Sequence, residues 1–266
     1  MTGPPKRVVS AGFTEQDDLL AVGVAPIAVT NWFGDQPLGV WPWAQPELGA
    51  TKPALLSLDD GINVDQIARL KPDLIVAINA GLDSESYRQL AAIAPTIAQS
   101  GGDAFFEPWR DQAAAVGKAV FRADQMTRMI DGVDAKFAAI AQTNADFKNR
   151  TALLLDGRFS GDTISATVSG WRTDFLTAMG FQTADRPGEI PRTELADALE
   201  GIDVLIWRTE DETEQALLLA EPAIAGLRNR NVFTTLELAG AIAFASPLSY
   251  PVVAEQLPPL LAHALN

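Results

Sequence analysis

Apolar residues recur at helical spacing through one long stretch near the middle of the chain, from Gly117 to Phe147. Charged residues separate apolar side chains that mostly fall three or four positions apart: Val120, Met126, Met129, Ile130, Val133, Phe137, Ile140 and Phe147. This spacing predicts a long amphipathic helix. Asp124 has the residue type of an N-cap within this run, so the first turns can form a separate short helix over Asp111–Phe121.

Short apolar runs of strand length alternate with helical patterns on both sides of this helix: Arg7–Ala11, Val24–Thr30, Asp73–Ile78, Pro95–Gln99, Thr151–Leu155 and Ile202–Trp207. The run Asp73–Ile78 (DLIVAI) is typical of a parallel strand that is buried on both faces. Asn63 is a suitable N-cap for a helix before that strand. The stretch from Glu189 to Leu199 is predicted to form a helix before the last run.

These patterns predict an α/β fold with two doubly wound lobes joined by one long spine helix. The expected boundaries are residues 1–110 for the N-terminal lobe, 111–148 for the helical linker and 149–266 for the C-terminal lobe. An ordinary packing helix within one larger domain is the alternative interpretation. Ligands of open parallel sheets bind beyond the carboxyl ends of the strands, so the loops after the strands of both lobes are expected to line a cleft.

Large aromatic side chains lie in the predicted loops rather than on periodic faces. In the first half of the chain they are Trp32, Phe33, Trp41, Trp43, Phe105, Phe106 and Trp109, and in the second half Phe159, Trp171 and Trp207. Rings in loops either cover the core or face a ligand, and the pattern leaves both interpretations open.

Two arginines, Arg158 and Arg208, each follow a predicted strand of the second half by one to three residues. In a binding cleft, a guanidinium group can bind carboxylate or catecholate oxygens through paired hydrogen bonds. The alternative is a surface arginine that pairs with Asp156 or Glu210.

The composition excludes several classes of function. The 266 residues carry a net charge of -14, which argues against nucleic-acid binding. There is no cysteine, and the single histidine, His263, lies near the C-terminus, so a thiolate site or a histidine-rich metal site is not expected. No glycine-rich nucleotide motif occurs, and no carboxylate pair such as Asp17-Asp18 is placed for hydrolysis. No apolar run approaches the roughly 20 residues that cross a membrane.

Four segments together resemble bacterial iron-siderophore substrate-binding proteins, the receptors of ABC importers for ferric siderophores, haem and cobalamin. The segments are RVVSAGFTEQDDLLAVGVAPIAVTNW, NVDQIARLKPDLIVAINAGL, Pro108-Trp109 and LAGAIAFASPLSYP. The resemblance covers essentially the whole chain. It implies two α/β lobes on one long helix, as in periplasmic binding proteins with a helical backbone. It also implies a receptor that holds its cargo between the lobes without changing it, rather than an enzyme.

The resemblance implies a ferric siderophore as cargo, with no intrinsic cofactor and no iron ligand from the protein, because the siderophore already wraps the iron. The expected ligand-binding residues are Phe13, Thr14, Trp32, Phe33, Trp41, Trp43, Asn79, Trp109, Arg158, Phe159, Trp171, Trp207 and Arg208. A haem receptor of the same fold is the first alternative, with Tyr250, Tyr87 or His263 as the iron ligand. Cobalamin is a lesser alternative, and a two-lobe enzyme the least favoured.

The resemblance further implies a partner and a location. Receptors of this family dock on a permease through one acidic residue of each lobe, and Glu85 and Glu194 stand in comparable places, unless they are ordinary solvated helix residues. We expect a monomer that acts in the periplasm or cell envelope, with or without a lipid anchor. The start, Met-Thr-Gly-Pro-Pro-Lys, lacks the features of a signal peptide, so either the signal has been removed or the protein is cytoplasmic.

Overall fold

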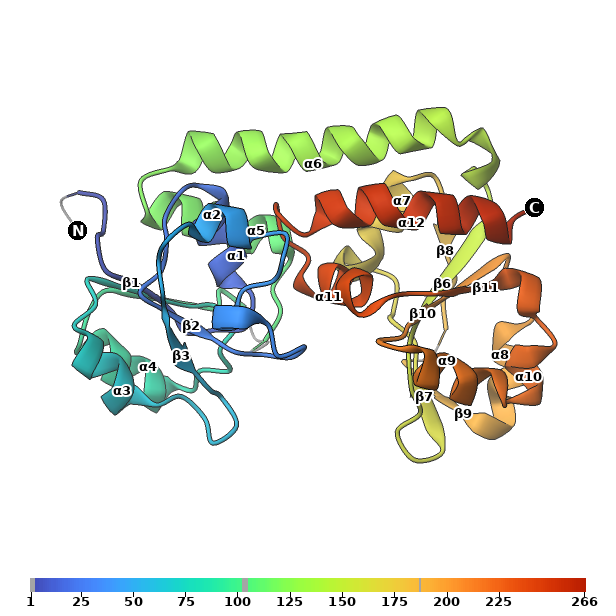
Figure 1. Ribbon diagram of the computed structural model, residues 1–266, viewed down its shortest axis with the longest axis horizontal. Helices are drawn as coiled ribbons and strands as arrows, with labels where there is room; N and C mark the ends of the chain where they lie inside the picture. The colour runs from blue at the N-terminus through green and yellow to red at the C-terminus, as the bar shows by residue number, and fades with distance from the viewer. Residues whose placement is uncertain (1–2, 102–104, 187) are drawn as a thin grey trace. The chain divides into compact units, whose positions relative to one another are not determined.

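The computed structural model describes residues 3–101, 105–186 and 188–266, and they form two compact units (Figure 1). The N-terminal unit comprises Met1–Gly132 together with Ser246–Ser249, and the C-terminal unit comprises Val133–Ala245 and Tyr250–Asn266. The chain therefore passes between the units within helix α6 (Ala123–Thr143) and again on each side of Ser246–Ser249. Within the described ranges, no helix is long and apolar enough to cross a membrane.

A parallel five-stranded sheet forms the centre of the N-terminal unit, in the order β3-β2-β1-β4-β5. Its strands are β1 (Val8–Ser10), β2 (Ala28–Thr30), β3 (Ala54–Leu56), β4 (Leu74–Ala77) and β5 (Thr96–Ala98). The helices are α1 (Glu15–Ala21), α2 (Gln45–Leu48), α3 (Val64–Leu70), α4 (Ser84–Ala91), α5 (Trp109–Ala119) and the first part of α6, with the 3-10 turn η1 (Pro37–Gly39).

Both faces of this sheet are covered, which explains why its strands are apolar throughout. Val9 and Ile75 pack with Ile67 of α3 on one face. Alternate residues of the same strands turn to the other face, where they form a core with α1, α5 and the start of α6: Val8, Leu74, Val76, Leu19, Val116 and Met126. Successive residues of a strand point to opposite faces, so this alternation makes the unit doubly wound.

The predicted helix boundaries are confirmed at two places. Asn63 caps α3 by accepting a hydrogen bond from the backbone N–H of Gln66 at 2.9 Å. The long helical run is broken as expected, because α5 ends at Ala119 and α6 begins at Ala123. Asp124 lies in the first turn of α6 rather than at its N-cap. The two helices meet closely at Gly117, where an added Cβ would lie 2.6 Å from Cβ of Met126.

The C-terminal unit has a four-stranded parallel sheet in the order β11-β10-β6-β8 and a separate antiparallel pair, β7 and β9. The strands are β6 (Thr151–Asp156), β7 (Thr163–Ser165), β8 (Gln182–Thr183), β9 (Glu189–Pro191), β10 (Val204–Arg208) and β11 (Asn231–Phe233). The helices are α7 (Asp174–Ala178), α8 (Leu195–Leu199), α9 (Glu212–Leu219), α10 (Pro222–Ala225), α11 (Leu236–Phe244) and α12 (Tyr250–Ala264). The remaining 3-10 turns are η2 (Ala145–Phe147), η3 (Trp171–Thr173), η4 (Arg192–Glu194) and η5 (Arg228–Arg230).

The predicted helix from Glu189 to Leu199 is wrong over its first half. Glu189–Pro191 forms strand β9, in which Ile190 pairs with Ile164 of β7, and the α-helix starts only at Leu195. Pro191 accounts for the difference, because proline lacks an N–H donor and biases the preceding residue toward extended backbone.

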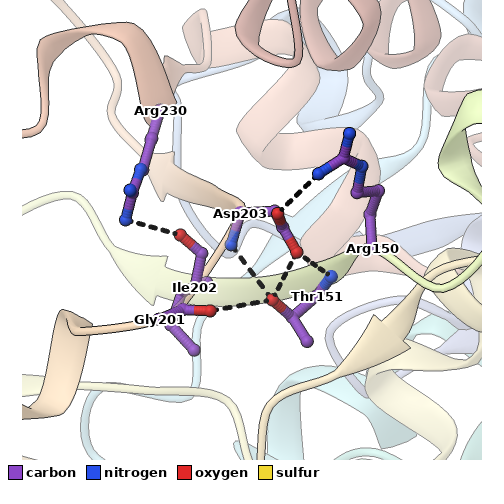
Figure 2. A network of polar contacts seen from close by, with 6 residues as sticks. All are labelled: Arg150, Thr151, Gly201, Ile202, Asp203 and Arg230. Carbon is purple, nitrogen blue, oxygen red and sulfur yellow. Dashed lines mark hydrogen bonds and ion pairs between the residues drawn. The ribbon is translucent and has the colours of Figure 1, made fainter.

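A polar clamp ties together the amino ends of the two central strands of the C-terminal unit (Figure 2). The Asp203 carboxylate accepts hydrogen bonds from the backbone N–H of Thr151 at 2.8 Å, from Thr151 Oγ1 at 2.9 Å and from Arg150 Nη1 at 3.0 Å. Burial of Asp203 opposes its ionisation, but the hydrogen bonds from Thr151 and Arg150 outweigh burial and lower its pKa. Arg230 Nη1 donates to the carbonyl of Ile202 at 3.2 Å.

The N-terminal unit has a counterpart at the start of β1 and β4. The Asp73 carboxylate accepts from the backbone N–H groups of Lys6 and Arg7, both at 2.8 Å. The Arg7 guanidinium donates to the carbonyls of Leu70 and Lys71. In each unit, therefore, an aspartate at the start of one central strand holds the start of the next, at the edge opposite to the loops where the candidate residues lie.

Candidate functional site

Aromatic side chains meet beyond the carboxyl ends of the N-terminal sheet, in loops that follow β1, β2 and β5. We call Phe13, Trp32, Phe33, Phe105 and Phe106 the aromatic cluster. Phe13 lies at its centre, with ring centroids 5.2 Å from Trp32, 5.7 Å from Phe105 and 6.4 Å from Phe106. Trp32 also contacts Phe33 edge-on at 4.7 Å and Phe106 at 5.3 Å. Phe105 is 41% exposed, and the other four rings are half-buried.

Two further tryptophans, Trp41 and Trp43, pack behind this cluster. The ring of Trp41 contacts Phe33 at 5.3 Å and stacks on Trp43 at 4.8 Å with nearly parallel planes. Trp41 is buried, at 2% exposure, and Trp43 Nε1 donates to Asp17 Oδ2 at 2.8 Å. Trp41, predicted to contact ligand, is therefore placed in a supporting layer.

Asn79, which is fully buried, holds two members of the cluster by their backbones. Its side-chain carbonyl accepts from the N–H of Phe106 at 2.9 Å, and its main-chain carbonyl accepts from the N–H of Phe13 at 3.1 Å. The side-chain amide donates to Thr14 Oγ1 at 3.1 Å. Asn79 and Thr14 were predicted to touch the ligand directly, but burial places both beneath the rings, where they fix the loops.

Three carboxylates of α1 are buried under this part of the unit: Glu15, Asp17 and Asp18. Glu15 accepts from the backbone N–H of Asn79 at 2.7 Å and of Thr14 at 3.2 Å. Its position requires glycine at residue 12, where an added Cβ would lie 2.2 Å from Glu15 Oε1. Burial raises the pKa of Glu15 to about 7, although these hydrogen bonds act in the opposite direction.

The other two carboxylates bind distant partners. Asp17 Oδ2 accepts from Trp43 and from Ser246 Oγ, the latter at 2.6 Å, and burial raises the Asp17 pKa to about 6. Asp18 accepts from Gln112 Nε2 at 2.7 Å. Burial raises the pKa of Asp18 well above its ordinary value, and the neighbouring Asp17 and Glu15 add to the effect. These acids thus serve hydrogen bonding, and the described residues hold no group of three or more His, Cys, Asp or Glu suited to a metal ion.

The predicted arginines of the C-terminal unit lie at the carboxyl ends of β6 and β10, and each has an acidic partner. Arg208 pairs with Asp156, its direct neighbour across the two strands. Arg158 lies 3.7 Å from Glu214, with 74% of its side chain exposed. The close approach of the two strand ends requires glycine at residue 157, where an added Cβ would lie 2.3 Å from the Arg208 carbonyl oxygen.

The aromatic residues expected to bind ligand in the C-terminal unit differ in their placement. Phe159 is partly buried, with the guanidinium of Arg192 at 3.9 Å from its ring centre. Trp171 is half-buried at the start of η3, with Arg172 over its ring at 5.0 Å. Trp207 is fully buried in the core, where its Nε1 donates to Asn231 at 2.9 Å. The prediction of a ligand-facing Trp207 is thus wrong, because β10 is buried on both faces.

Trp109 also differs from expectation. It begins helix α5 rather than lying in a loop, and it is 2% exposed with the Arg110 guanidinium 4.5 Å from its ring centre. The Trp109 ring therefore packs inside the protein rather than presenting a surface to ligand.

Residues predicted for other roles lie apart from the cluster. Glu85 is exposed on α4 and pairs with Arg88, and Glu194 is exposed in η4, so their docking role stays a prediction. Of the haem-ligand alternatives, Tyr250 is 1% exposed between Phe137 and Phe175, while Tyr87 and His263 are exposed. Hollows of about 490 and 400 Å³ beside α3 and α4 contain none of the cluster residues.

Sequence reasoning did not find the buried acids of α1 or their partners Gln112 and Ser246. Thr14 to Asp17 has the composition of an exposed helix start, and acidic residues in a first turn are ordinarily solvated. The available signal was the first serine of the segment SPLSY, Ser246, whose hydroxyl group donates to Asp17 in the folded unit.

Comparison with known proteins assigns this chain to a family. The family model described as periplasmic binding protein matches residues 8–237. The chain is 29% identical over 191 residues to the probable siderophore-binding lipoprotein YfiY of Bacillus subtilis (strain 168), an alignment that covers 70% of this chain and 54% of the relative. The chain thus spans about half the length of that relative.

Solved structures agree over nearly the whole chain. A periplasmic solute-binding protein from Mycobacterium smegmatis str. MC2 155 is 58% identical, with a TM-score of 0.98 over 99% of this chain and 94% of the other. PiaA from Streptococcus pneumoniae TIGR4, solved with ferrichrome, is 22% identical with a TM-score of 0.79 over 100% and 95% of the two chains, and shares the fold. These neighbours are solute-binding proteins rather than enzymes, and the chain belongs to the periplasmic binding protein family.

Proposed function

We propose that this protein is the extracytoplasmic substrate-binding protein of an ABC importer and that it captures a ferric siderophore on the aromatic cluster. The observation that supports this most directly is the meeting of five aromatic rings at the carboxyl edge of the N-terminal sheet. Parallel sheets bind ligands at this edge. The name of the Bacillus relative, a probable siderophore-binding lipoprotein, supports the same class of cargo.

The physical basis is burial of the apolar outside of a chelate against ring faces. Each square ångström of apolar surface removed from water contributes about 25 cal/mol. Phe13 and Phe106 are held at the backbone by Asn79, so little conformational entropy remains to be lost when cargo binds. The chelator already coordinates the iron, and the proposal therefore requires no iron ligand from the protein.

Other residues complete the proposal. In the C-terminal unit we assign contact with the cargo to Phe159, Trp171 and the two arginines Arg158 and Arg208. Glu85 and Glu194 are proposed to dock the loaded protein on the permease, where their carboxylates would pair with basic side chains. We expect the receptor to work as a monomer outside the cytoplasmic membrane.

Isothermal titration calorimetry of the purified chain with ferric hydroxamate, catecholate and carboxylate chelates tests the proposal. We expect one class to bind with a Kd below about 10 μM. Phe13→Ala should raise that Kd roughly 10- to 100-fold, the effect of losing about 1.5–3 kcal/mol of aromatic burial. Phe121→Ala is the matched control, because Phe121 is 49% exposed in the same unit and does not belong to the cluster.

Two results would refute the proposal. One is that no chelate of any class binds to protein whose circular dichroism shows it to be folded. The other is that Phe13→Ala and Phe121→Ala bind the chelate equally well, which would place the cargo away from the cluster.

A further inference from the structure

We infer that the cargo is an uncharged or weakly cationic ferric chelate, a hydroxamate complex rather than a catecholate or carboxylate one. This inference rests on the proposed function and names the chemical class of its substrate. A ferric tris-hydroxamate is neutral, because each hydroxamate group carries a single negative charge. Ferric tris-catecholates and citrate-type chelates are anions, so the charge of the binding surface distinguishes the classes.

Basic side chains at the carboxyl edge of the C-terminal unit are paired with acids. Each of the three described arginines near Phe159 and the strand ends has a carboxylate partner: Arg208 with Asp156, Arg158 with Glu214, and Arg192 with Glu221. Recognition of an anion depends on cations whose charge is available to it. At these three positions the positive charge already faces an acid of the same unit.

The pair of Arg208 and Asp156 is the most constrained of the three. The two residues are register partners on adjacent strands, and both side chains are partly buried, at 27% and 38% exposure. Arg208 Nε is buried and makes no hydrogen bond within the part of the chain that is described. An anionic chelate would have to draw Arg208 away from Asp156 and would meet the repulsion of the released carboxylate. A neutral chelate leaves the pair intact.

The N-terminal unit places aromatic rings over buried carboxylates. The surface assigned to cargo there is formed by phenyl and indole rings, and the titratable groups buried beneath it are carboxylates: Glu15, Asp17 and Asp18. These groups are negative or neutral at any pH, so they cannot attract an anion. Aromatic ring faces, in turn, tolerate neutral ligands and attract cations.

Long-range electrostatics also disfavours an anionic chelate. The net charge of -14 repels anions during their approach, and salt screens this repulsion beyond about 8–10 Å.

The test compares chelates of different charge on the intact chain by calorimetry. The probes are ferrichrome as a neutral hydroxamate, ferrioxamine B as a hydroxamate with a free ammonium group, ferric enterobactin as a catecholate, and ferric citrate. We expect the hydroxamates to bind at least about 100-fold more tightly than the two anions. Ferrichrome affinity should change less than about twofold between low and high salt, because a neutral ligand is insensitive to screening.

A substitution tests the cause directly. Asp156→Asn frees the charge of Arg208 and should strengthen binding of ferric enterobactin at least about 10-fold, whereas Asp146→Asn makes the same change in net charge at an exposed residue of the same unit and should not. Tighter binding of either anion than of ferrichrome by the unmodified protein would overturn the inference, as would an Asp156→Asn variant that is folded and gains nothing. If no chelate binds at all, the proposed function itself fails.

Discussion

The two units build the amino ends of their sheets alike and the carboxyl ends differently. At the amino ends, Asp73 and Asp203 hold neighbouring strands through backbone N–H groups, and arginines cover nearby carbonyls. At the carboxyl ends, the N-terminal unit presents aromatic rings over buried acids, whereas the C-terminal unit presents arginines paired with acids. The two units thus use the same kind of contact at the edge that stabilises each sheet. They present different side chains at the edge that we assign to cargo.

The pKa values of Asp203 and Glu15 show the same contrast between the two edges. Asp203 receives enough hydrogen bonds to keep its pKa low in spite of partial burial. Glu15 is completely enclosed, so burial prevails over its hydrogen bonds and raises the pKa to about 7. A clamp of the first kind stabilises the protein at neutral pH, while an enclosed acid of the second kind costs stability when it ionises.

The largest effect that we predict is the pH dependence caused by Glu15. Its pKa in the folded protein, about 7, exceeds the ordinary value of 4.5, so the folded state binds the proton more tightly. The stability that this proton supplies is present at low pH and is lost as pH rises from about 4.5 to about 7. The loss is on the order of 3 kcal/mol.

Urea unfolding across this pH range measures the effect. Glu15→Gln should remove the share of the decline that Glu15 causes, leaving the contributions of Asp17 and Asp18, whose pKa values burial also raises. Equal slopes for the unmodified protein and the Gln variant would show that Glu15 does not hold a proton near neutrality.

The second prediction concerns the clamp of the C-terminal unit. Asp203→Ala leaves the N–H of Thr151 and the Arg150 guanidinium without this acceptor, and the Thr151 hydroxyl with only the distant carbonyl of Gly201 at 3.4 Å. The substitution should lower the free energy of unfolding by about 2 kcal/mol. The exposed Asp146→Ala is the control and should change it by less than about 0.5 kcal/mol. If the two variants lose the same stability in urea, the clamp does not stabilise the sheet.

The third prediction separates support of the aromatic cluster from stability of the unit. Asn79→Ala leaves the N–H of Phe106 unsatisfied and should cost about 1–2 kcal/mol of stability, with cargo affinity weakened roughly tenfold. Asn63→Ala removes the cap of α3 in the same unit at a cost of about 1 kcal/mol, and should leave affinity unchanged. Calorimetry and urea unfolding on both variants test this. An equal loss of affinity in both variants would mean that Asn79 has no special role in positioning the rings.

The sequence allowed the frame of each unit to be predicted, because burial on both faces leaves apolar runs such as Leu74–Ala77 and caps such as Asn63 leave local signals. The break before α6 and the occurrence of aromatic residues in loops could also be predicted, because both can be read from the local sequence. Trp207 was misjudged because a loop ring and a core ring at the end of a strand have the same local sequence.

The buried acids of α1 lay beyond local reasoning altogether. Their burial depends on partners far along the chain, and Ser246, for example, lies 229 positions from Asp17. The same holds for the acidic partners of Arg158 and Arg208, since only tertiary structure decides which carboxylate neutralises which arginine.

The most direct test of the account is to locate the iron. Crystals of the protein grown with ferrichrome, or with whichever ferric chelate binds best, would give the iron position from its anomalous scattering. We predict that the iron lies beside Phe13 and Trp32, with the chelate against the ring faces of the aromatic cluster. Iron found elsewhere, for instance in the polar hollow lined by Ser57, Asp60 and Asn63, would contradict the assignment of the cluster as the binding surface.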